Sequence, residues 1–545
     1  MTVLESRDIL GGKARSLPVP GSGVGGRADL PAEHGFRFFP GFYRHLPDTM
    51  RRIPFAGQAD GVAGNLVSAT RTLIAQAGGR NELVGATHAP ESLDDLAVLS
   101  MFLRDWATTV GIPLSEHAYF MERLLILLAS CDERRLGQWE HESWWEFSGA
   151  EDRSDAYGKF LADGLTRTLV AARAHEMSAR TGGLILLQLL FDLARVGGRA
   201  DRVLNAPTNE AWITPWEAHL RELGVELRIG SPVLGIGFDD GRVTGITVGR
   251  PDGEQEIVHA DHYVAALPVE QLRLLVTPEM RQVEPRLGAL DRLVTRWMNG
   301  AMFYLDTDVP LVHGHAIYID SEWALTSISQ RQFWAGVDLG GYGDGRVEGI
   351  LSVDVSEWDR PGRRTGKVAS KCTLEEIRDE IWGQLCDHLN DGATPVLDWG
   401  NVVSWFLDPA IQFPNPSEAT NLEPLLVNTA GSWADRPEAT TQIANLFLAS
   451  DFVRTKTDLA TMEGANEAAR LAVNAILERA GSKAPRCTLF APTEPRLFAA
   501  ARSWDRVRWW LFRRRARPLL QVKADGGLEP TGPFAAALVR WASRR

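Results

Sequence analysis

The sequence is poor in cysteine and in long apolar runs. Its four cysteines, spread over 545 residues, form no Cys-x-x-Cys pair, which argues against a disulfide framework and the common zinc motifs. The strongest apolar stretch, residues 183–194, is broken by Gln188 and Asp192 and is shorter than the ~18 residues that cross a bilayer. The chain does not open with a basic and then apolar secretory signal. We therefore expect a cytoplasmic protein.

Positive charge is scarce except at one end of the chain. There are 58 Lys and Arg against 70 Asp and Glu, a net charge of −12, which argues against nucleic-acid binding. Residues 496–545, however, hold twelve basic residues and three acidic ones. Within them, Arg502–Arg517 mixes tryptophan with arginine. Two interpretations stay open: contact with an anionic membrane surface, or a solvated basic helix docked by its tryptophans.

The composition is that of a large globular protein, with 44% hydrophobic and 23% charged residues. We predict an α/β fold with an additional helical part, divided into two interleaved domains and a basic tail. The first domain is expected at 1–40, 205–270 and 440–480, the second domain at 41–204 and 271–439, and the tail at 481–545. Apolar periodicity predicts a helical region at 92–196, and a helix is expected over Leu374–Leu389. Asp239-Asp240-Gly241, between two alternating runs, predicts a hairpin. The sequence leaves the oligomeric state open.

The first informative motif is VLESRDILGGKARS, Val3–Ser16. Glu5 closes a short predicted strand, where dinucleotide-binding folds place the acid that binds a ribose. Gly11 and Gly12 would let the backbone pass close to a cofactor, and Lys13 would bring positive charge near its phosphates. The alternative is an ordinary strand followed by a Gly-Gly turn.

A second glycine motif, Gly21–Gly26, matches G-x-G-x-x-G. That fingerprint needs a strand before it and a helix after it, whereas prolines lie on both sides here, so we predict a surface loop. In a complete dinucleotide unit the glycines precede the ribose-binding acid by ~20 residues, and here four residues precede Glu5. We therefore expect a Rossmann-like domain that is truncated at its N-terminus and a chain that holds its cofactor weakly.

The third motif lies near the other end of the chain, at residues 445–477. An apolar strand leads to Asp451, and a helix opens at Thr461 and Met462. The unpaired N–H groups and the positive dipole end of such a helix can meet the electron-rich edge of a flavin. A plain strand–helix unit would have the same composition.

Taken together, the two ends resemble the FAD-dependent amine oxidase and carotenoid (phytoene) desaturase superfamily. The segments Glu33–Tyr43 and Asn428–Ser432 are similar to its desaturase side. The resemblance implies FAD as cofactor, in a discontinuous Rossmann-like domain beside a mixed sheet and helical substrate domain. It implies FAD contacts through Glu5, Lys13, Val233, Asp451 and Met462, with Val233 acting through its backbone; Gly11, Gly12 and Thr461 complete the predicted cofactor-binding set.

Two departures bear on the branch of the superfamily. Amine oxidases often carry a lysine in the strand that reads WMNGAMFYL here, where Asn299 stands, and an aromatic residue at the position of Met462. The chain is therefore most similar to hydroxysqualene dehydroxylase-like bacterial desaturases. This implies hydride transfer from a hydrophobic, isoprenoid-like substrate, with no catalytic side chain assigned. The alternatives are a flavin amine oxidase of secondary metabolism and a non-catalytic truncated paralogue that has lost FAD.

Two further groups of side chains have plainer interpretations. His313 and His315 lack a visible third ligand, so we predict no metal site. The aromatic residues between Trp139 and Phe147 are predicted to pack between helices rather than to line a substrate tunnel.

Overall fold

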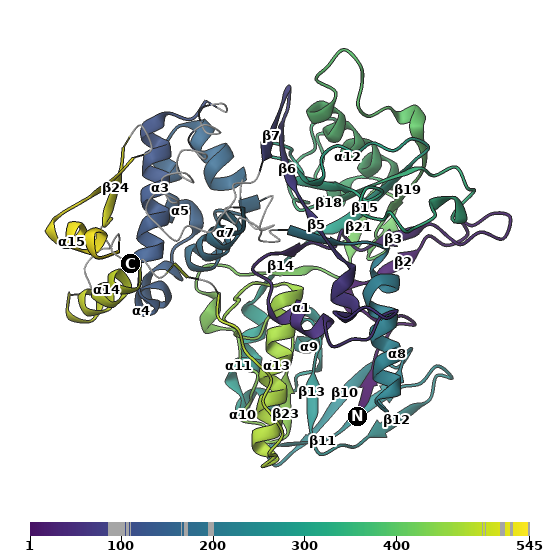
Figure 1. Cartoon of the computed structure of the whole chain (residues 1–545). Helices are drawn as coiled ribbons and strands as arrows, with labels where there is room; N and C mark the ends of the chain where they lie inside the picture. Colours follow the sequence, from purple (N-terminus) through teal and green to yellow (C-terminus); the bar gives the residue numbers. More distant parts are fainter. Residues whose placement is uncertain are drawn as a thin grey trace.

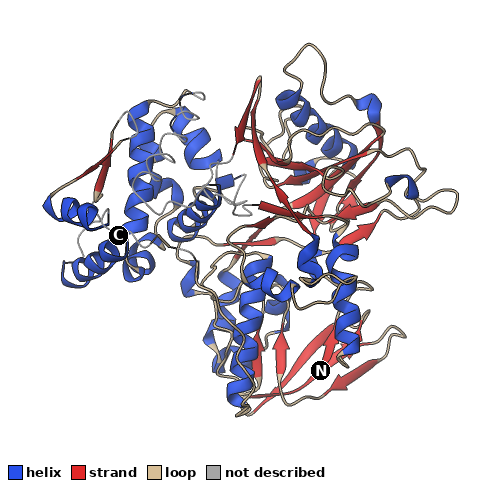
Figure 2. Cartoon of the chain, in the orientation of Figure 1, coloured by secondary structure: helices blue, strands red, loops and turns tan. Residues whose placement is uncertain are grey.

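The computed structural model describes residues 1–84, 104, 108, 111–164, 166–167, 173–193, 201–492, 494–495, 498–512, 518–523 and 527–542. Three parts are visible in Figure 1: a lower part with the N-terminus, an upper part built on a large sheet, and a helical part that carries the C-terminal elements. Figure 2 shows that strands concentrate in the first two parts and helices in the third.

The lower part contains two parallel strand pairs. They are β1 (Thr2–Leu4) with β9 (Glu226–Arg228), and β13 (Tyr263–Ala265) with β23 (Leu446–Leu448). Among the described residues, no strand joins the two pairs into one sheet. All three residues of β23 are buried, as expected for a strand covered on both faces. The expected truncation of this domain stays a prediction.

An antiparallel sheet and several helices complete the lower part. The sheet comprises β10 (Val233–Asp239), β11 (Arg242–Gly249) and β12 (Gln255–Val258). The helices are α8 (Thr214–Glu222), α9 (Val269–Leu275), α10 (Pro278–Val283), α11 (Pro285–Ala289) and α13 (Met462–Arg479). The hairpin predicted at Asp239–Gly241 is confirmed by the pairing of Asp239 with Arg242. Helices α9, α10 and α13 share one hydrophobic core with β13 and β23.

The upper part is organised by a seven-stranded sheet in the order β19-β15-β18-β17-β16-β6-β7. Its strands are β6 (Arg71–Gln76), β7 (Gly79–Val84), β15 (Asn299–Leu305), β16 (Gly314–Tyr318), β17 (Leu325–Ser329), β18 (Gly349–Val355) and β19 (Val402–Leu407). Every residue of β15 is buried. Helix α12 (Leu374–Leu389) packs on this sheet and begins with a capping box between Thr373 and Glu376. It has the limits that the sequence predicts.

Short elements connect these parts. They are β2 (Ser16–Pro18), β3 (Pro31–Glu33), β4 (Phe39–Pro40), α1 (His45–Met50), β5 (Leu66–Ala69), β8 (Asp201–Leu204), β14 (Val294–Arg296), β20 (Ile411–Asn415), β21 (Glu418–Asn421) and β22 (Leu425–Val427). The antiparallel pair of β14 and β22 runs between the lower part and the other two (Figure 1).

The helical part contains α3 (Leu114–Ala129), α4 (Asp132–Arg134), α5 (Trp144–Ser148) and α7 (Ala179–Leu193). The C-terminal elements α14 (Ala499–Phe512), β24 (Leu520–Val522), β25 (Leu528–Pro530) and α15 (Pro533–Ala542) pack against it (Figure 1). Helices α3 and α7 meet closely, since a Cβ added to Gly183 would lie 2.3 Å from Leu127. The helical region predicted at 92–196 is confirmed where the structure describes it; residues 92–103 lie outside the described residues. The mixed α/β class is confirmed, while the domain boundaries stay a prediction.

Candidate functional site

Glu5 lies at the carboxyl end of β1, where the chain turns beside β9. Its backbone N–H donates to the carbonyl of Arg228 over 2.9 Å, and its carbonyl accepts from the N–H of Ser231 over 2.8 Å. The half-buried carboxylate accepts from the backbone N–H of Arg7 over 2.9 Å. Val233 follows Ser231 by two residues and starts β10. The fold therefore brings Glu5 and Val233, which are far apart in the sequence, to the same end of the parallel pair.

The Gly-Gly turn adopts a backbone that other residues disfavour. Gly11 has φ 114° and Gly12 has φ 54°, both in the left-handed region that suits glycine. A Cβ added to Gly12 would meet no atom within 4 Å. The turn therefore leaves open space beside Gly12, as a cradle for a ligand requires, whereas a Cβ added to Gly11 would lie 3.1 Å from Arg15.

Lys13 follows this turn and is held by the protein itself. Its ammonium donates to the Glu270 carboxylate over 2.7 Å and to the Pro424 carbonyl over 2.5 Å. Lys13 thereby connects the glycine turn to the residue before β22. In this structure its charge is paired with Glu270, which sequence reasoning did not anticipate.

The C-terminal motif forms the strand–loop–helix unit predicted from the sequence. Asp451 lies in the turn after β23 and is half-buried, with its carbonyl 3.3 Å from an Arg436 guanidinium nitrogen. Thr461 is the N-cap of α13, and its hydroxyl accepts from the Gly464 N–H over 3.2 Å. Met462 is the first residue of α13 and packs in one hydrophobic cluster with Leu10 and Ala14. The start of α13 and the segment that contains Gly11, Gly12 and Lys13 therefore pack on the same hydrophobic cluster.

A buried ionic network supports the loop before α13. Asp458 pairs with Arg436 and with Arg180, the second over 2.5 Å, and accepts from the Thr181 hydroxyl. Asp458 has φ 47°, a left-handed conformation that costs a non-glycine residue free energy unless surrounding contacts hold it. Because Arg180 and Thr181 belong to α7, this network ties the helical part to the loop that leads into α13.

A cavity of about 190 Å³ lies where the three parts meet. Its walls come from β4 and its surroundings, from α7, from the β14–β15 connection, from β22 and from the loop before α13. They are lined by Phe38, Pro40, Phe42, Tyr43, Met177, Ile185, Leu189, Arg296, Trp297, Met298, Leu425, Leu426, Val427, Asn428, Leu459, Ala460 and Thr461. Most of these side chains are apolar, and none is Lys, His, Asp or Glu.

The polar residues of the lining are Tyr43, Arg296, Asn428 and Thr461. The amide nitrogen of Asn428 donates to the Asp458 carbonyl over 3.3 Å, but its buried Oδ1 has no hydrogen-bond partner. Arg296 donates to Glu176 over 3.0 Å. Burial raises the pKa of Tyr43, so this phenol stays neutral. The cavity can therefore accept a hydrogen bond at Asn428 and contact an apolar molecule elsewhere.

Asn299 does not belong to this lining. It is buried at the start of β15, where its amide donates to Asp408 over 2.8 Å and its oxygen accepts from Asn421 over 2.7 Å. The residues just before it, Trp297 and Met298, line the cavity instead. The expectation that Asn299 stands where an amine oxidase would place a reactive-centre lysine thus gains no support from the cavity.

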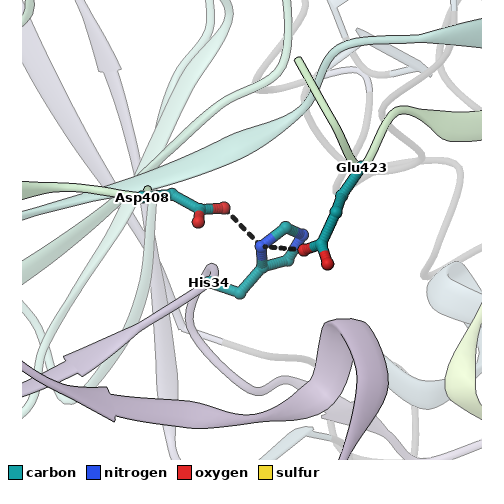
Figure 3. Close-up of side chains that lie close together, drawn as sticks. All are labelled: His34, Asp408 and Glu423. Carbon is teal, nitrogen blue, oxygen red and sulfur yellow. Dashed lines mark ion pairs between the residues drawn. The ribbon is translucent and has the colours of Figure 1, made fainter. Parts of the chain in front are cut away.

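A second buried cluster lies beside the first residues of β15 (Figure 3). His34 stands between Asp408 and Glu423, with its Nδ1 in contact with Asp408 and 3.4 Å from Glu423. In the part of the chain that the structure describes, this is the one group of His, Cys, Asp and Glu close enough to share a metal ion. Glu423, however, also pairs with Arg7 and Arg15. Because two guanidinium groups already neutralise Glu423, we interpret the cluster as a buried ion-pair network.

The protonation of this network follows from burial and hydrogen bonding. Burial on its own would raise the pKa of Asp408, but hydrogen bonds from His34, Ala410 and Asn299 leave it lowered. Burial is also the main cause that lowers the pKa of His34. The arrangement is a neutral imidazole that donates from Nδ1 to an ionised carboxylate.

The remaining sequence motifs lie away from the cavity. No helix follows the glycine loop 21–26, whose Gly21 and Gly23 N–H groups donate to the Asp29 carboxylate, which confirms the surface-loop prediction. His313 contacts Thr70, whereas His315 lies between Phe36 and Phe38 with ring centroids 5.1 and 5.0 Å away.

The aromatic residues predicted as helix packing are confirmed in that role. Trp139, Trp144 and Phe147 are buried in the core of the helical part, with Trp145 packed against it. None of them lines the cavity. Met177 and Ile185, which do line it, were not singled out, because a single apolar residue carries no functional signal in the sequence. The resemblance at Asn428–Ser432 was the one signal that pointed to this region.

The site residues fit a flavin dinucleotide. The glycine turn leaves room beside its backbone, Glu5 presents a carboxylate at a strand end, and the first turn of α13 together with the unpaired Oδ1 of Asn428 offers polar contacts beside an apolar cavity. Such a fold and site define an FAD-dependent oxidoreductase.

The family is established by sequence. The pattern of the flavin-containing amine oxidoreductases matches residues 1–477, and the chain belongs to this family. Its cofactor is therefore FAD and it is an enzyme, so the alternative of a non-catalytic protein is set aside. No curated protein sequence matches the chain significantly.

Solved structures agree on the fold. An oxidoreductase from Methanosarcina mazei has a TM-score of 0.53 at 12% identity, with 88% of this chain and 94% of that chain covered. Cyclohexylamine oxidase from Brevibacterium oxydans IH-35A has a TM-score of 0.53 at 12% identity, with 88% and 93% covered. Putrescine oxidase bound to putrescine has a TM-score of 0.52 at 14% identity, with 87% and 93% covered. At these identities the likeness shows the fold alone.

None of the described helices has both the length and the apolar character that crossing a membrane requires.

Proposed function

We propose that this FAD-dependent oxidoreductase removes hydride from a hydrophobic, isoprenoid-like substrate. The observation that carries the proposal is the lining of the cavity, in which apolar side chains from all three parts of the molecule surround one unpaired amide oxygen. Removal of hydride from an apolar chain depends on positioning more than on a strong base, and the lining contains no carboxylate, lysine or histidine.

The proposed roles follow from position. Glu5, Gly11, Gly12, Lys13 and Val233 would hold the adenosine and phosphate end of FAD. Asp451, Thr461 and Met462 would hold the flavin end, close to the cavity. FAD, when bound, supplies the hydride acceptor.

The protein's own side chains would position the substrate and exclude water. Ile185 and Leu189 of α7, together with Met177 just before this helix, form an apolar wall, whose contact with a hydrocarbon chain is stabilised by the hydrophobic effect. The Oδ1 of Asn428 would accept a hydrogen bond from a hydroxyl of the substrate or from an N–H of the flavin ring.

Substrate-dependent loss of visible flavin absorbance under anaerobic conditions tests the proposal. FAD-loaded protein is incubated with long-chain isoprenoids and, separately, with primary amines. We expect isoprenoids to bleach the flavin. Bleaching by amines together with no response to isoprenoids would overturn the proposal.

A matched pair of variants ties the result to the cavity. Leu189→Arg places a charge in the lining, where Leu189 is 7% exposed, whereas Leu274→Arg places the same charge at a site 75% exposed on α9. We expect the first variant to lose at least about tenfold in kcat/KM, because an unpaired charge is costly in an apolar site, and the second to keep wild-type activity. If Leu189→Arg does not fold, Leu189→Trp, which fills the cavity without adding a charge, replaces it in the assay.

The second candidate is amine oxidation. Putrescine oxidase and cyclohexylamine oxidase are among the structures of similar fold, and the cavity presents the aromatic rings of Phe38, Phe42, Tyr43 and Trp297, whose faces attract cations. The amine arm of the same assay tests this candidate.

A further inference from the structure

The exposed face of α14 is unusually apolar. Trp504 is 44% exposed, Val507 45%, Trp510 79% and Leu511 53%. At about 100° per residue, these four positions cover an arc of about 120° on one side of the helix. We call this arc the α14 outer stripe. An exposed apolar strip of this kind marks a surface that meets something other than water.

The opposite side of α14 is firmly docked. Asp505 accepts from the Arg134 guanidinium at two positions, both over 2.9 Å, and from the Cys131 N–H over 3.0 Å. The Trp509 ring stacks on Arg134, whose guanidinium carbon is 5.0 Å from the ring centroid. The outer stripe, on the side of α14 away from these contacts, is therefore held in a fixed orientation.

The packing of α14 decides which side chains of the predicted Trp- and Arg-rich segment face outward. Trp509 packs inward over Gly137, and Arg502 is turned to Glu494 at 3.1 Å, so neither belongs to the outer stripe. Val507 and Leu511, which sequence reasoning did not single out, take the outward positions.

Charge lies on both sides of the stripe. On a helical projection Arg506 and Arg508 flank the four apolar positions, and Arg506 is exposed while it pairs with Glu133. The sequence that follows α14 adds four arginines in residues 513–517, within a C-terminal fifty residues whose net charge is +9 in a chain of net charge −12. Aromatic and aliphatic side chains bordered by arginine match the boundary between lipid headgroups and acyl chains.

We propose that the α14 outer stripe docks on an anionic lipid surface. Trp504, Val507, Trp510 and Leu511 enter the headgroup boundary, and the flanking arginines meet the lipid phosphates. The proposal stands on the surface of the helix and does not depend on the identity of the substrate.

Docking of this kind would also bring the helical part, which forms one wall of the cavity, to the membrane surface. Helix α14 packs on α3, and α3 packs on α7, whose side chains form one wall of the cavity. One compact helical part therefore carries both the outer stripe and the cavity wall.

Co-sedimentation of the full chain with vesicles tests the proposal. We expect binding to vesicles that contain phosphatidylglycerol at low salt, little binding to pure phosphatidylcholine, and release at high salt, because salt screens the attraction. Failure of the folded chain to bind the anionic vesicles at low salt would overturn the proposal.

A pair of double variants separates the stripe from general surface hydrophobicity. Trp510→Ser with Leu511→Ser should lower the vesicle-bound fraction about tenfold or more. Leu223→Ser with Leu274→Ser removes two leucines that are 65% and 75% exposed elsewhere and should bind as the wild type does. Circular dichroism verifies that each variant is folded.

Two outcomes would assign the stripe to something else. Wild-type binding by the Trp510/Leu511 variant would show that the stripe does not touch lipid. A vesicle-free dimer that dissociates on the same substitutions would show that the stripe is covered by a second copy of the chain, and that result would also overturn the proposal.

Discussion

His45 and Glu463 form a buried hydrogen bond, with the imidazole Nδ1 2.8 Å from the carboxylate. The Nε2 of the same ring accepts from the Phe490 N–H over 2.9 Å. Since Nε2 is an acceptor, the ring proton lies on Nδ1 and is donated to Glu463. Glu463 is the second residue of α13, so the pair fastens the beginning of α13 to α1.

The Glu463 carboxylate also accepts hydrogen bonds from the backbone at the start of α1. It accepts from the N–H groups of Arg44, His45 and Leu46 over 2.7 to 2.9 Å. Glu463→Ala would leave these donors unpaired, and a buried unpaired polar group costs ~1–3 kcal/mol. We expect a loss of roughly 3 kcal/mol or more in the free energy of unfolding, measured by denaturant titration. Glu279→Ala, an exposed acid at the same position of α10, should have a much smaller effect; equal losses would contradict the role assigned to Glu463.

Glu5→Ala should weaken FAD binding. Removal of a charge-assisted hydrogen bond costs ~1.5–3 kcal/mol, so the Kd, measured by flavin fluorescence titration, should rise about tenfold or more. Glu226→Ala removes an exposed acid of the neighbouring strand β9 and should leave the Kd unchanged. An unchanged Kd for Glu5→Ala would show that Glu5 only ends a strand.

Gly12→Ala and Gly21→Ala form a second matched pair. Both glycines have positive φ, 54° and 74°, and an added Cβ meets no atom within 4 Å at either. Both variants should lose ~1–2 kcal/mol of stability, because alanine disfavours this backbone. Only Gly12→Ala should raise the Kd for FAD, since only Gly12 lies in the proposed cradle. A rise in both variants would mean that the effect comes from general strain.

His315 should make the protein sensitive to acid. Burial lowers its pKa from 6.5 to about 4 in the folded state, so the unfolded chain binds the proton more readily between these values. Stability should therefore fall as the pH drops from ~6.5 to ~4, by up to ~3 kcal/mol from this group. His315→Leu removes the titration, and the difference in free energy of unfolding between the two proteins should change over this range. Parallel stability curves would contradict the assignment.

Local patterns predicted the elements that are defined by short stretches of sequence. The β10–β11 hairpin follows from Asp-Asp-Gly between alternating runs, and the limits of α12 were placed from the sequence, although its capping box was not anticipated. The unit from β23 to α13 could be placed because an apolar strand, an acid and a helix start follow one another along the chain. The approach of Glu5 to Val233 was available only through the resemblance.

Contacts between distant segments were not predictable in this way. The cluster of His34, Asp408 and Glu423 joins residues that follow β3, β19 and β21, and none of these stretches is unusual by itself. The pairing of Lys13 with Glu270 and the inward turn of Trp509 depend likewise on the packing partner. Periodicity predicts that a helix has two faces, but the neighbour decides which face is covered.

The bond between Glu463 and the backbone of α1 has a consequence for synthesis of the chain. The Leu46 N–H and its acceptor are 417 residues apart, and at ~5–20 residues per second the acceptor is made roughly 20 to 80 seconds after its donor. Strand β1 likewise cannot form its parallel pair until β9 has been synthesised. The lower part of the molecule therefore cannot close until Glu463 has been synthesised, and the backbone donors of α1 stay without this partner during that interval.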